Sequence, residues 1–296
     1  MPPQERWEKR ARVREWAIGI DEAGRGPVLG PLVYAACACP AGCEGTRIPS
    51  GVTDSKQLSA AQRETLYGQL RRRPPDQLAT WTVVISPQEI SAKMLAPRKI
   101  NLNTISHDAA LRLVAQAIDA GYFITEAYVD TVGGAAEYER KFRERFPSLR
   151  RVVVQAKADS AFALVSAASI VAKVTRDRQL RAWAMPRGIQ DGDAGRACGP
   201  AVDWGSGYPS DPDTQQWLAR NVHPVFGYPP LVRFSWSTCE ERLRRHAVKV
   251  TWAVSEGEQL KPAKADSILH FFLRKEQGTS RKRPGWCLRR LGMTRE

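Results

Sequence analysis

The sequence lacks the features of membrane, secreted and zinc-binding proteins. No apolar run approaches the ~18 residues that a membrane span needs, and the N-terminal stretch MPPQERWEKRARVREW is too charged for a secretory signal. Six cysteines and four histidines form no Cys-x-x-Cys pair and no Cys/His cluster. We therefore expect a nuclear or cytosolic protein with reduced thiols, without a membrane span, zinc site or disulfide framework.

Acidic residues are outnumbered in this chain of 296 residues. There are 31 Asp and Glu against 45 Lys and Arg, a formal net charge of +14. Such a charge favours a polyanionic partner, of which nucleic acid is the first candidate, and a merely basic surface is the alternative. The hydrophobic content of 43% is enough for one large core or two modest ones, so we expect a soluble globular protein.

Apolar runs alternate with helical patterns along the first 250 residues. Ser59 and Gln62 form a capping box ahead of a helix that reaches about Arg72. Further helices are expected at 103–120, 160–180 and 239–247, and strands at 16–20, 28–38, 80–85, in FITEAYVD and in RRVVVQAKAD. Strands separated by helices predict a mixed α/β domain with a central sheet.

Four acidic residues lie where predicted strands end. Asp21, Glu22 and Asp130 each close a strand, and Asp159 lies between a strand and a helix. Ligands of open α/β sheets bind at this edge. Asp159 could instead cap its helix, and the Asp21-Glu22 pair could begin a turn. Two adjacent carboxylates repel each other unless a cation or a proton settles the charge, and oxygen ligands favour Mg²⁺ or Mn²⁺.

Six separated motifs carry a resemblance to a known family. They are IGIDEAGRGPVLGPLVYA, VTDSKQLS, NLNTISHDAA, AYVDTVG, AKADSAFALVSAASIVAKVTRD and GSGYPSDP. In this order they resemble the catalytic A-subunit chains of the eukaryotic type 2 ribonuclease H family, over roughly residues 16–236. The downstream PVFGYPPLVRFSW is similar to the eukaryotic rather than the shorter bacterial chains.

The resemblance implies a ribonuclease H-like mixed sheet flanked by helices, with a small helical C-terminal region. It implies an endonuclease that cuts the RNA strand of RNA/DNA hybrids and the 5′ side of single ribonucleotides in duplex DNA, leaving 3′-hydroxyl and 5′-phosphate ends. The family's four catalytic carboxylates fall on Asp21, Glu22, Asp130 and Asp159, which suit in-line hydrolysis with two divalent ions. The alternatives are a non-catalytic scaffold that binds hybrids and another nuclease of this fold.

The resemblance also implies nucleic-acid contacts. Glycines at 24 and 26 would let the main chain approach the ribose 2′-hydroxyl, with Arg25 beside the scissile phosphate, although a tight turn would also explain them. Tyr208 matches the aromatic position that packs on the sugar after the ribonucleotide, or it is an ordinary loop tyrosine. The other candidates are Lys56, oriented by Asp54, Asn101, and the α-helical Lys173 and Arg176, which could instead lie on a solvated face.

The chain divides into four predicted segments. They are a basic extension at 1–15, the catalytic domain at 16–236, a helical partner-docking region at 237–273 and a flexible basic tail at 274–296. The family works with two accessory subunits, which implies docking after about Phe234. ADSILHFF at 265–272, with Ile268, Phe271 and Phe272, resembles a sliding-clamp docking motif. Ala265 replaces its usual glutamine, so a small amphipathic helix is the alternative.

Overall fold

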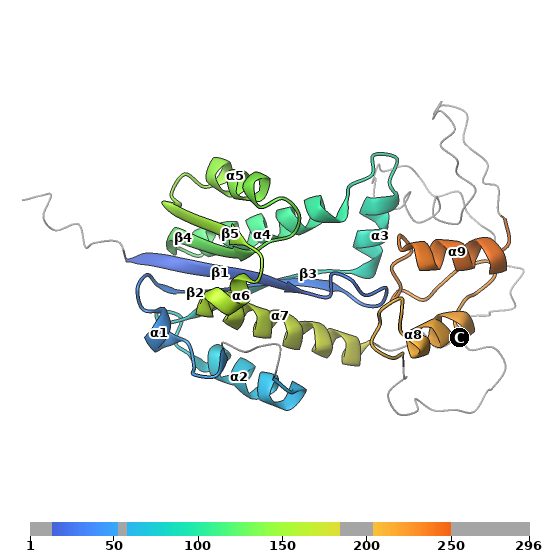
Figure 1. Ribbon diagram of the computed structural model, residues 1–296, viewed down its shortest axis with the longest axis horizontal. Coiled ribbons are helices and arrows are strands. Elements are labelled where there is room, and N and C mark those ends of the chain that lie inside the picture. Colours follow the sequence, from blue (N-terminus) through green and yellow to red (C-terminus); the bar gives the residue numbers. More distant parts are fainter. Residues whose placement is uncertain (1–13, 53–57, 184–203, 250–296) are drawn as a thin grey trace, which may run out of the picture.

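A five-stranded mixed sheet forms the centre of the molecule. The computed structural model describes residues 14–52, 58–183 and 204–249 (Figure 1). The strand order is β3-β2-β1-β4-β5, with β1 pairing antiparallel to β2 and parallel to β4. The strands are β1 (Glu15–Ala23), β2 (Leu32–Pro40), β3 (Ala79–Ile85), β4 (Phe123–Asp130) and β5 (Arg151–Gln155). The predicted mixed α/β architecture is confirmed.

The register of the central strands brings two predicted acids to the same edge. Ile20 of β1 lies opposite Val129 of β4, so Asp21 and Asp130 follow next on neighbouring parallel strands. Successive side chains of a strand point to opposite faces of the sheet. Asp21 therefore shares the face of Ala17, and Glu22 shares the face of Ile20.

One face of the sheet packs against three helices, α3 (Pro87–Leu95), α4 (Leu102–Asp119) and α5 (Ala135–Arg145), as Figure 1 shows. Ile18 and Ile20 of β1 are fully buried against this layer. Each contributes about 1.5–3 kcal/mol by burial of its side chain. The layer also includes Ile105, Leu113, Val114, Tyr138 and Phe142.

The opposite face packs against α1 (Glu44–Arg47), α2 (Ala60–Arg72), α6 (Ala158–Ala161) and α7 (Ala163–Ala182). Helix α7 crosses β1 so closely that a Cβ on Gly19 would lie 2.4 Å from the backbone of Leu164. Small residues along α7, such as Ala167 and Ala168, are fully buried in this layer. No helix in the described ranges is long and apolar enough to span a membrane.

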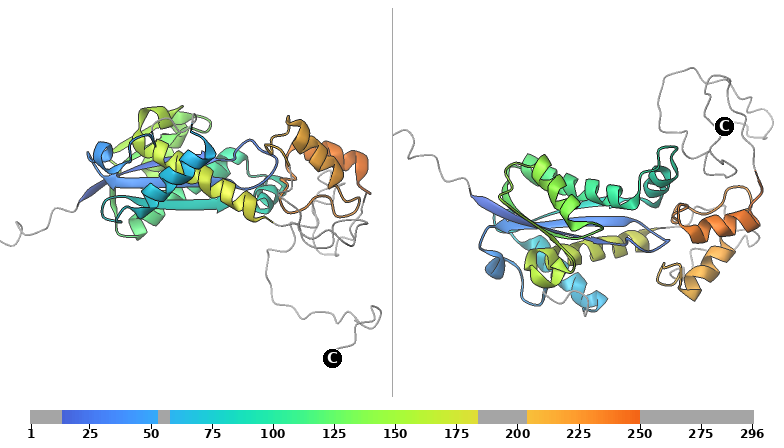
Figure 2. Two further views of the ribbon diagram at one scale, coloured as in Figure 1. Left: turned by 90° about the horizontal axis from the view of Figure 1, so that it is seen from below. Right: turned by 45° about the horizontal axis from the view of Figure 1, so that its top comes forward.

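A third cluster lies beyond the end of the sheet, where α8 (Pro212–Arg220) and α9 (Ser237–His246) form a separate lobe (Figure 2). Its core includes Val28 and Leu29, which come from the loop between β1 and β2. Trp217, Leu218 and Leu243 pack around these two residues. The β1–β2 loop is therefore built into the core of the C-terminal lobe, although the predicted boundary at 236/237 stays a prediction.

Several predicted boundaries were wrong. The second strand begins at Leu32 rather than Val28, because residues 28–31 leave the sheet to pack in the lobe. The helix predicted at 160–180 is two helices, since the chain is extended at Phe162 between α6 and α7. The capping box of Ser59 and Gln62 is confirmed at the start of α2. Four helices were not predicted: α1, α3, α5 and α8.

Candidate active site

The four predicted acids lie at one end of the sheet. Asp21 and Glu22 are near the end of β1, Asp130 ends β4, and Asp159 lies within the short helix α6. Asp21 and Asp159 are only 6% and 5% exposed. Asp159 does not cap a helix, because Lys157 and Phe162 occupy the N-cap positions of α6 and α7.

Burial and mutual repulsion act on the pair in β1. Burial raises the pKa of Asp21, and the charges of Asp130 and Asp159 raise it further, while hydrogen bonds from Ser169 and from the Glu22 backbone act against this shift. Burial also raises the pKa of Glu22, together with the charges of Asp21 and Asp130. All four carboxylates are therefore close enough to influence one another, directly or through a neighbour.

The donor chemistry of these acids fits a hard divalent cation. Among the described residues, no three His, Cys, Asp or Glu side chains already form a metal-ligating group. Mg²⁺, however, is usually bound by one or two carboxylates, with water and phosphate oxygens completing its shell. Glu22 Oε2 is buried, and neither this atom nor the nearby Tyr34 hydroxyl makes a hydrogen bond of normal geometry in the described structure, which suits a cation at this position.

The backbone between β5 and α6 positions two of the acids. Lys157 has φ 59°, the only positive φ among the described non-glycine residues. This left-handed residue turns the chain so that the Ala158 N–H donates to Asp130 Oδ1 at 2.9 Å. The next residue is Asp159. A strained residue therefore fixes Asp130 and Asp159 relative to each other, at a cost of about 1–3 kcal/mol.

The Gly24-Arg25-Gly26 loop follows β1 directly. Gly24 has φ +85°, and a Cβ there would lie 2.6 Å from Cδ and Nε of Arg176, so this position requires glycine. The Arg25 guanidinium donates to Ser106 Oγ at 2.6 Å and to Asn103 Oδ1, both on α4. Arg25 is thus held beside Glu22, whose pKa its charge lowers in part.

A buried arginine that the sequence analysis missed supports this loop. Arg233 is fully buried, and its Nε, Nη1 and Nη2 donate to the carbonyl oxygens of Gly30 at 2.8 Å, of Arg25 at 3.0 Å and of Gly24. Its guanidinium lies 4.8 Å from the ring centre of Trp236. The Trp236 indole N–H donates to the Gly26 carbonyl at 3.0 Å. A charged residue inside the apolar run PPLVRFSW was the available signal.

Tyr208 lies against the same loop. A Cβ on Gly26 would approach the Tyr208 ring to 3.0 Å, and this tyrosine is 48% exposed. The Gly207 carbonyl accepts hydrogen bonds from the N–H groups of Val28 and Leu29 at 2.8 and 3.3 Å. The turn before Tyr208 is held by Asp211 Oδ2, which accepts from the Ser206 N–H at 2.6 Å.

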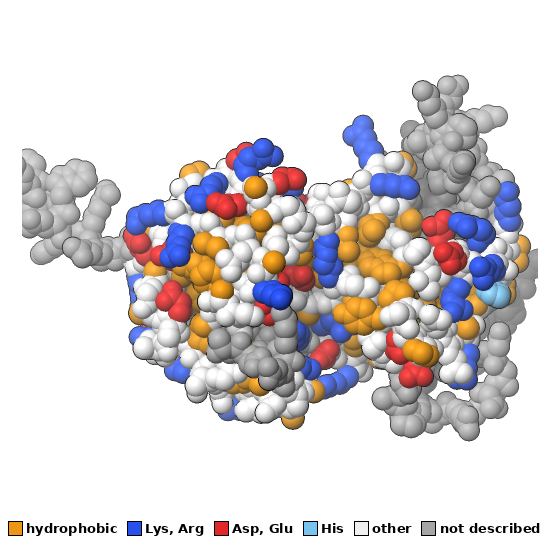
Figure 3. All heavy atoms as spheres, viewed as in Figure 1, with side chains coloured by type: hydrophobic (Ala, Val, Ile, Leu, Met, Phe, Trp, Pro, Cys, Tyr) orange, Lys and Arg blue, Asp and Glu red, His pale blue; other side chains and the backbone are white. Residues whose placement is uncertain are grey.

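The remaining candidates differ in placement. Asn101 caps α4, because its Oδ1 accepts from the Thr104 N–H at 2.8 Å. Lys173 is partly buried on α7, and Arg176 on the same helix is packed beneath Gly24. Asp54 and Lys56 lie outside the described residues. Figure 3 shows Lys and Arg side chains spread over the visible face with acidic groups between them, rather than in one basic stripe.

Comparison with known proteins matches this arrangement to one family. The family model named Ribonuclease HII matches residues 18–239. The chain belongs to the ribonuclease HII family. It is 47% identical over 258 residues to the ribonuclease H2 A subunit of Arabidopsis thaliana, covering 85% of this chain and 83% of that one. The human A subunit is 43% identical over 242 residues, covering 81% and 77%.

Solved structures of the ribonuclease HII family share the fold. The crystal structure of ribonuclease H2 from Pyrococcus horikoshii OT3 is 30% identical, with a TM-score of 0.61 over 78% of this chain and 98% of that one. The RNase HII of a PCNA:RNase HII complex from Archaeoglobus fulgidus is 32% identical, with a TM-score of 0.56, and the coverage is 75% and 95%. As a ribonuclease HII family member, the chain is a metal-dependent endonuclease of the ribonuclease H class.

Proposed function

We propose that the chain is the catalytic subunit of a type 2 ribonuclease H. It cuts the RNA strand of RNA/DNA hybrids and cuts on the 5′ side of single ribonucleotides embedded in duplex DNA, leaving 3′-hydroxyl and 5′-phosphate ends. The observation that carries the proposal is the mutual influence of Asp21, Glu22, Asp130 and Asp159 next to a glycine loop, in a chain of the ribonuclease HII family.

The four carboxylates would hold two divalent ions, Mg²⁺ or Mn²⁺. Such ions, when bound, activate a water and neutralise the leaving oxygen of a phosphodiester. The protein's own contribution is positioning: the Ala158 N–H fixes Asp130, and the burial of Asp21 and Asp159 keeps bulk water from them. Arg25, held by Asn103 and Ser106, places a positive charge beside the scissile phosphate. No covalent protein intermediate is required.

Selection of RNA rests on the glycine loop in this proposal. The 2′-hydroxyl both donates and accepts a hydrogen bond, so it distinguishes RNA from DNA. Gly24 and Gly26 expose the main chain for close approach, because Arg233 and Trp236 hold the loop carbonyls from behind. The exposed Tyr208 ring, in contact with Gly26, is positioned to pack on the sugar that follows the ribonucleotide.

A cleavage assay tests the proposal. The purified full chain, alone and with candidate accessory subunits, is incubated with Mg²⁺ or Mn²⁺ and with duplex DNA that contains one ribonucleotide. We expect a single cut on the 5′ side of the ribonucleotide with a 3′-hydroxyl end. Tight hybrid binding without any cleavage would instead support the scaffold alternative.

Tyr208→Ala tests the junction role. Loss of the ring removes a contact worth about 1–3 kcal/mol, so cleavage at single ribonucleotides is expected to fall about tenfold, and cleavage of long hybrids much less. Equal losses on both substrates would remove Tyr208 from junction recognition. Gln215→Ala, on α8 near the same turn, is a matched control for local disturbance.

The partners and location are part of the proposal. Two accessory subunits would dock after about Phe234. Lys56, oriented by Asp54, and Asn101, Lys173 and Arg176 would contact the nucleic-acid backbone. The basic tail at 274–296, with eight basic and two acidic side chains, suits a nuclear protein.

The clamp-like segment 265–272 lies outside the described residues. Calorimetry of a peptide of residues 260–278 with a sliding clamp tests it, and no detectable heat would end the idea.

A further inference from the structure

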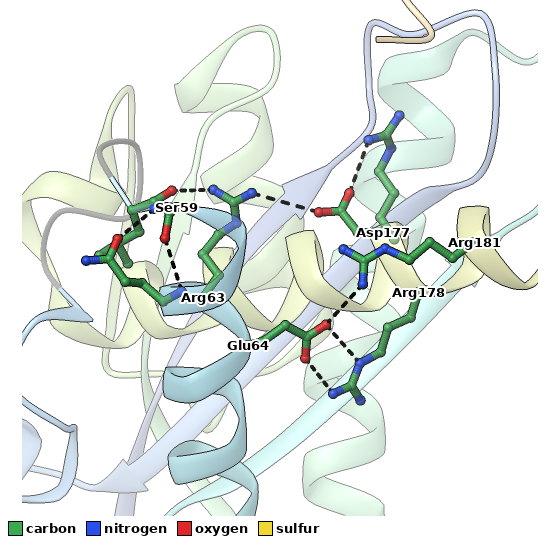
Figure 4. Close-up of polar contacts among 9 residues, drawn as sticks. Ser59, Arg63, Glu64, Asp177, Arg178 and Arg181 are labelled. Atoms are coloured by element: carbon green, nitrogen blue, oxygen red, sulfur yellow. Dashed lines mark hydrogen bonds and ion pairs between the residues drawn. The ribbon is translucent and has the colours of Figure 1, made fainter. Parts of the chain in front are cut away.

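Asp177 on α7 lies between two arginines from different parts of the molecule. Its Oδ1 is 3.7 Å from Nη1 of the neighbouring Arg176, and its Oδ2 is 3.9 Å from Nη2 of Arg63 on α2 (Figure 4). The side chains of Arg176, Arg63 and Asp177 are 14%, 21% and 32% exposed. They are thus more shielded from solvent than a typical surface ion pair, whose contribution is small.

On one side, this carboxylate acts on an arginine beneath the glycine loop. The stem of Arg176 fills the space next to Gly24, where a Cβ would clash with it. Arg176 is also close enough to the buried Arg233 for its charge to oppose that of Arg233. Asp177 supplies the opposite charge, so it stabilises Arg176 in a position that would otherwise hold two buried cations together.

On the other side, the same carboxylate acts on the start of α2. Arg63 Nη1 donates to the Leu58 carbonyl at 2.6 Å, which ties the guanidinium to the residues just ahead of the helix. Ser59 caps the helix at the next position. One continuous set of contacts therefore runs from the Leu58 carbonyl through Arg63, Asp177 and Arg176 to Gly24. We call it the Asp177 bridge.

We propose that Asp177 is a positioning residue for nucleic-acid binding, because the Asp177 bridge holds the Gly24–Gly26 loop and the start of α2 at one fixed separation. This rests on the proposed function, in which the loop contacts the ribonucleotide. A duplex that contacts both elements would bind a surface that is already ordered. The free energy of binding would then not have to include the cost of ordering the loop and the start of α2.

The same pair of helices offers a matched control. Glu64 on α2 pairs with Arg178 on α7 at 2.6 Å and with Arg181 at 3.8 Å (Figure 4). This ion pair also joins α2 to α7, but it contacts neither Leu58 nor Arg176. Glu64→Gln therefore removes an interhelical ion pair of the same kind and leaves the Asp177 bridge intact.

Amide hydrogen exchange on the full chain tests the bridge without requiring activity. In Asp177→Asn we expect faster exchange at both the Gly24–Gly26 loop and residues 58–63, by about fivefold or more. Arg63→Gln should loosen the same two segments, and Asp177→Glu should restore them. In Glu64→Gln both segments should exchange as in the wild type. Loosening of only one segment, or equal loosening in Glu64→Gln, would overturn the proposal.

Steady-state cleavage separates positioning from general destabilisation. For Asp177→Asn we expect the KM for ribonucleotide-containing duplex to rise about tenfold, while kcat stays within about twofold. Glu64→Gln should keep the wild-type KM. A wild-type KM in Asp177→Asn contradicts the positioning role. Absence of cleavage by the wild-type chain with its subunits would contradict the proposed function instead, and the exchange result would still decide whether the bridge exists.

Discussion

Two neighbouring regions of this molecule bury charge in opposite ways. Near the end of β1, Asp21 is buried and Glu22 is partly buried next to other carboxylates. The Oε2 atom of Glu22 makes no hydrogen bond of normal geometry among the described residues. Behind the adjacent glycine loop, Arg233 is buried more completely, but it donates to three backbone carbonyls and lies against Trp236.

This difference distinguishes a buried charge whose hydrogen-bond partners all lie within the protein from buried charges that need a bound cation or a proton for compensation. Arg233 has its acceptors within the protein, so its burial stabilises the fold and fixes the loop that it contacts. The carboxylates repel one another, and this destabilises the fold until an external cation or a proton compensates. Substitutions in the two regions should therefore change stability in different directions.

Asp21→Asn and Asp130→Asn should each lower the cleavage activity, and Asp21→Asn should at the same time raise the stability of the fold. Each substitution removes the charge of a proposed metal ligand, so cleavage should fall by about 10²–10³-fold or more. Hybrid binding should stay mostly intact, because it depends on basic and main-chain groups. Asp21→Asn also relieves buried repulsion, so the Tm measured in EDTA should rise.

Rate assays on an RNA/DNA hybrid, filter binding and thermal melts make these three measurements. Asp119→Asn, at the end of α4 and away from the site, is the control. A wild-type cleavage rate in Asp21→Asn or Asp130→Asn would refute the metal assignment. A lower Tm for Asp21→Asn would show that its burial is compensated within the protein.

Arg233→Gln should destabilise the chain, whereas Arg176→Gln should not. The first substitution leaves buried carbonyls of Gly24, Arg25 and Gly30 without their donor, at a cost of about 1–3 kcal/mol for each group left unsatisfied. The second relieves the repulsion between two neighbouring buried cations but also breaks the Asp177 bridge, so the global stability should change little. Its affinity for hybrid should fall, and the salt dependence of binding should weaken by about one unit of slope. Urea unfolding and salt titrations of binding measure both. Equal destabilisation would contradict the contrast.

A pair of substitutions at Lys157 tests whether the backbone turn between β5 and α6 positions Asp130 and Asp159. Lys157→Gly should raise stability by up to about 1 kcal/mol, because glycine adopts positive φ without strain, whereas Lys157→Ala should change it little or lower it. Both remove the same side-chain charge, so each is the control for the other. If activity falls equally in the two variants, the Lys157 charge matters more than the turn.

The surroundings of the His107 side chain predict that the stability of the fold depends slightly on pH. Its Nε2 lies 3.0 Å from the Val132 carbonyl, its ring stacks on Tyr138 at 3.8 Å, and Lys141 lies 3.1 Å from Nδ1. Burial lowers the pKa of His107, and the charges of Lys141 and Arg25 lower it further. The hydrogen bond with the Val132 carbonyl and the charge of Glu137 raise this pKa and so offset part of the shift.

Because the folded-state pKa is lower than the unfolded one, the contribution of neutral His107 is present above the unfolded pKa of about 6.5 and is lost as the pH falls below it. His107→Gln cannot gain a proton, so its Tm should fall less between pH 7 and pH 5 than that of the wild type. Parallel melts of the two chains over this range provide the measurement, and identical slopes would exclude a role for His107.

The sequence predicted the mixed sheet and the strands that carry Asp21 and Asp130, because both follow from local patterns; the catalytic role of the acids stays a prediction. The apolar runs around Asp21 and Asp130 indicate strands, and the capping box at Ser59 marks the start of α2. The amphipathic α5 and the short α3 were missed, although Ser86 with Pro87 is a recognisable helix start.

Long-range contacts could not be predicted. Nothing local indicates that residues 28–31 leave the sheet, since their apolar character suits a strand as well as the core of the C-terminal lobe. The role of Arg233 depends on carbonyls more than 200 positions away. The opposite facing of Asp21 and Glu22 follows from strand geometry, but their burial depends on how the helices pack.

The contact of Arg233 with the glycine loop has a consequence for synthesis of the chain on the ribosome. The loop is made early, but its carbonyls at Gly24 and Arg25 receive their donor only after 209 and 208 further residues have emerged. Until then, the nascent sheet carries its crowded acids without a finished Gly24–Gly26 loop. A product truncated just before Arg233 would therefore retain all four acids but not the loop conformation, so we expect the enzyme to become competent only near the end of translation.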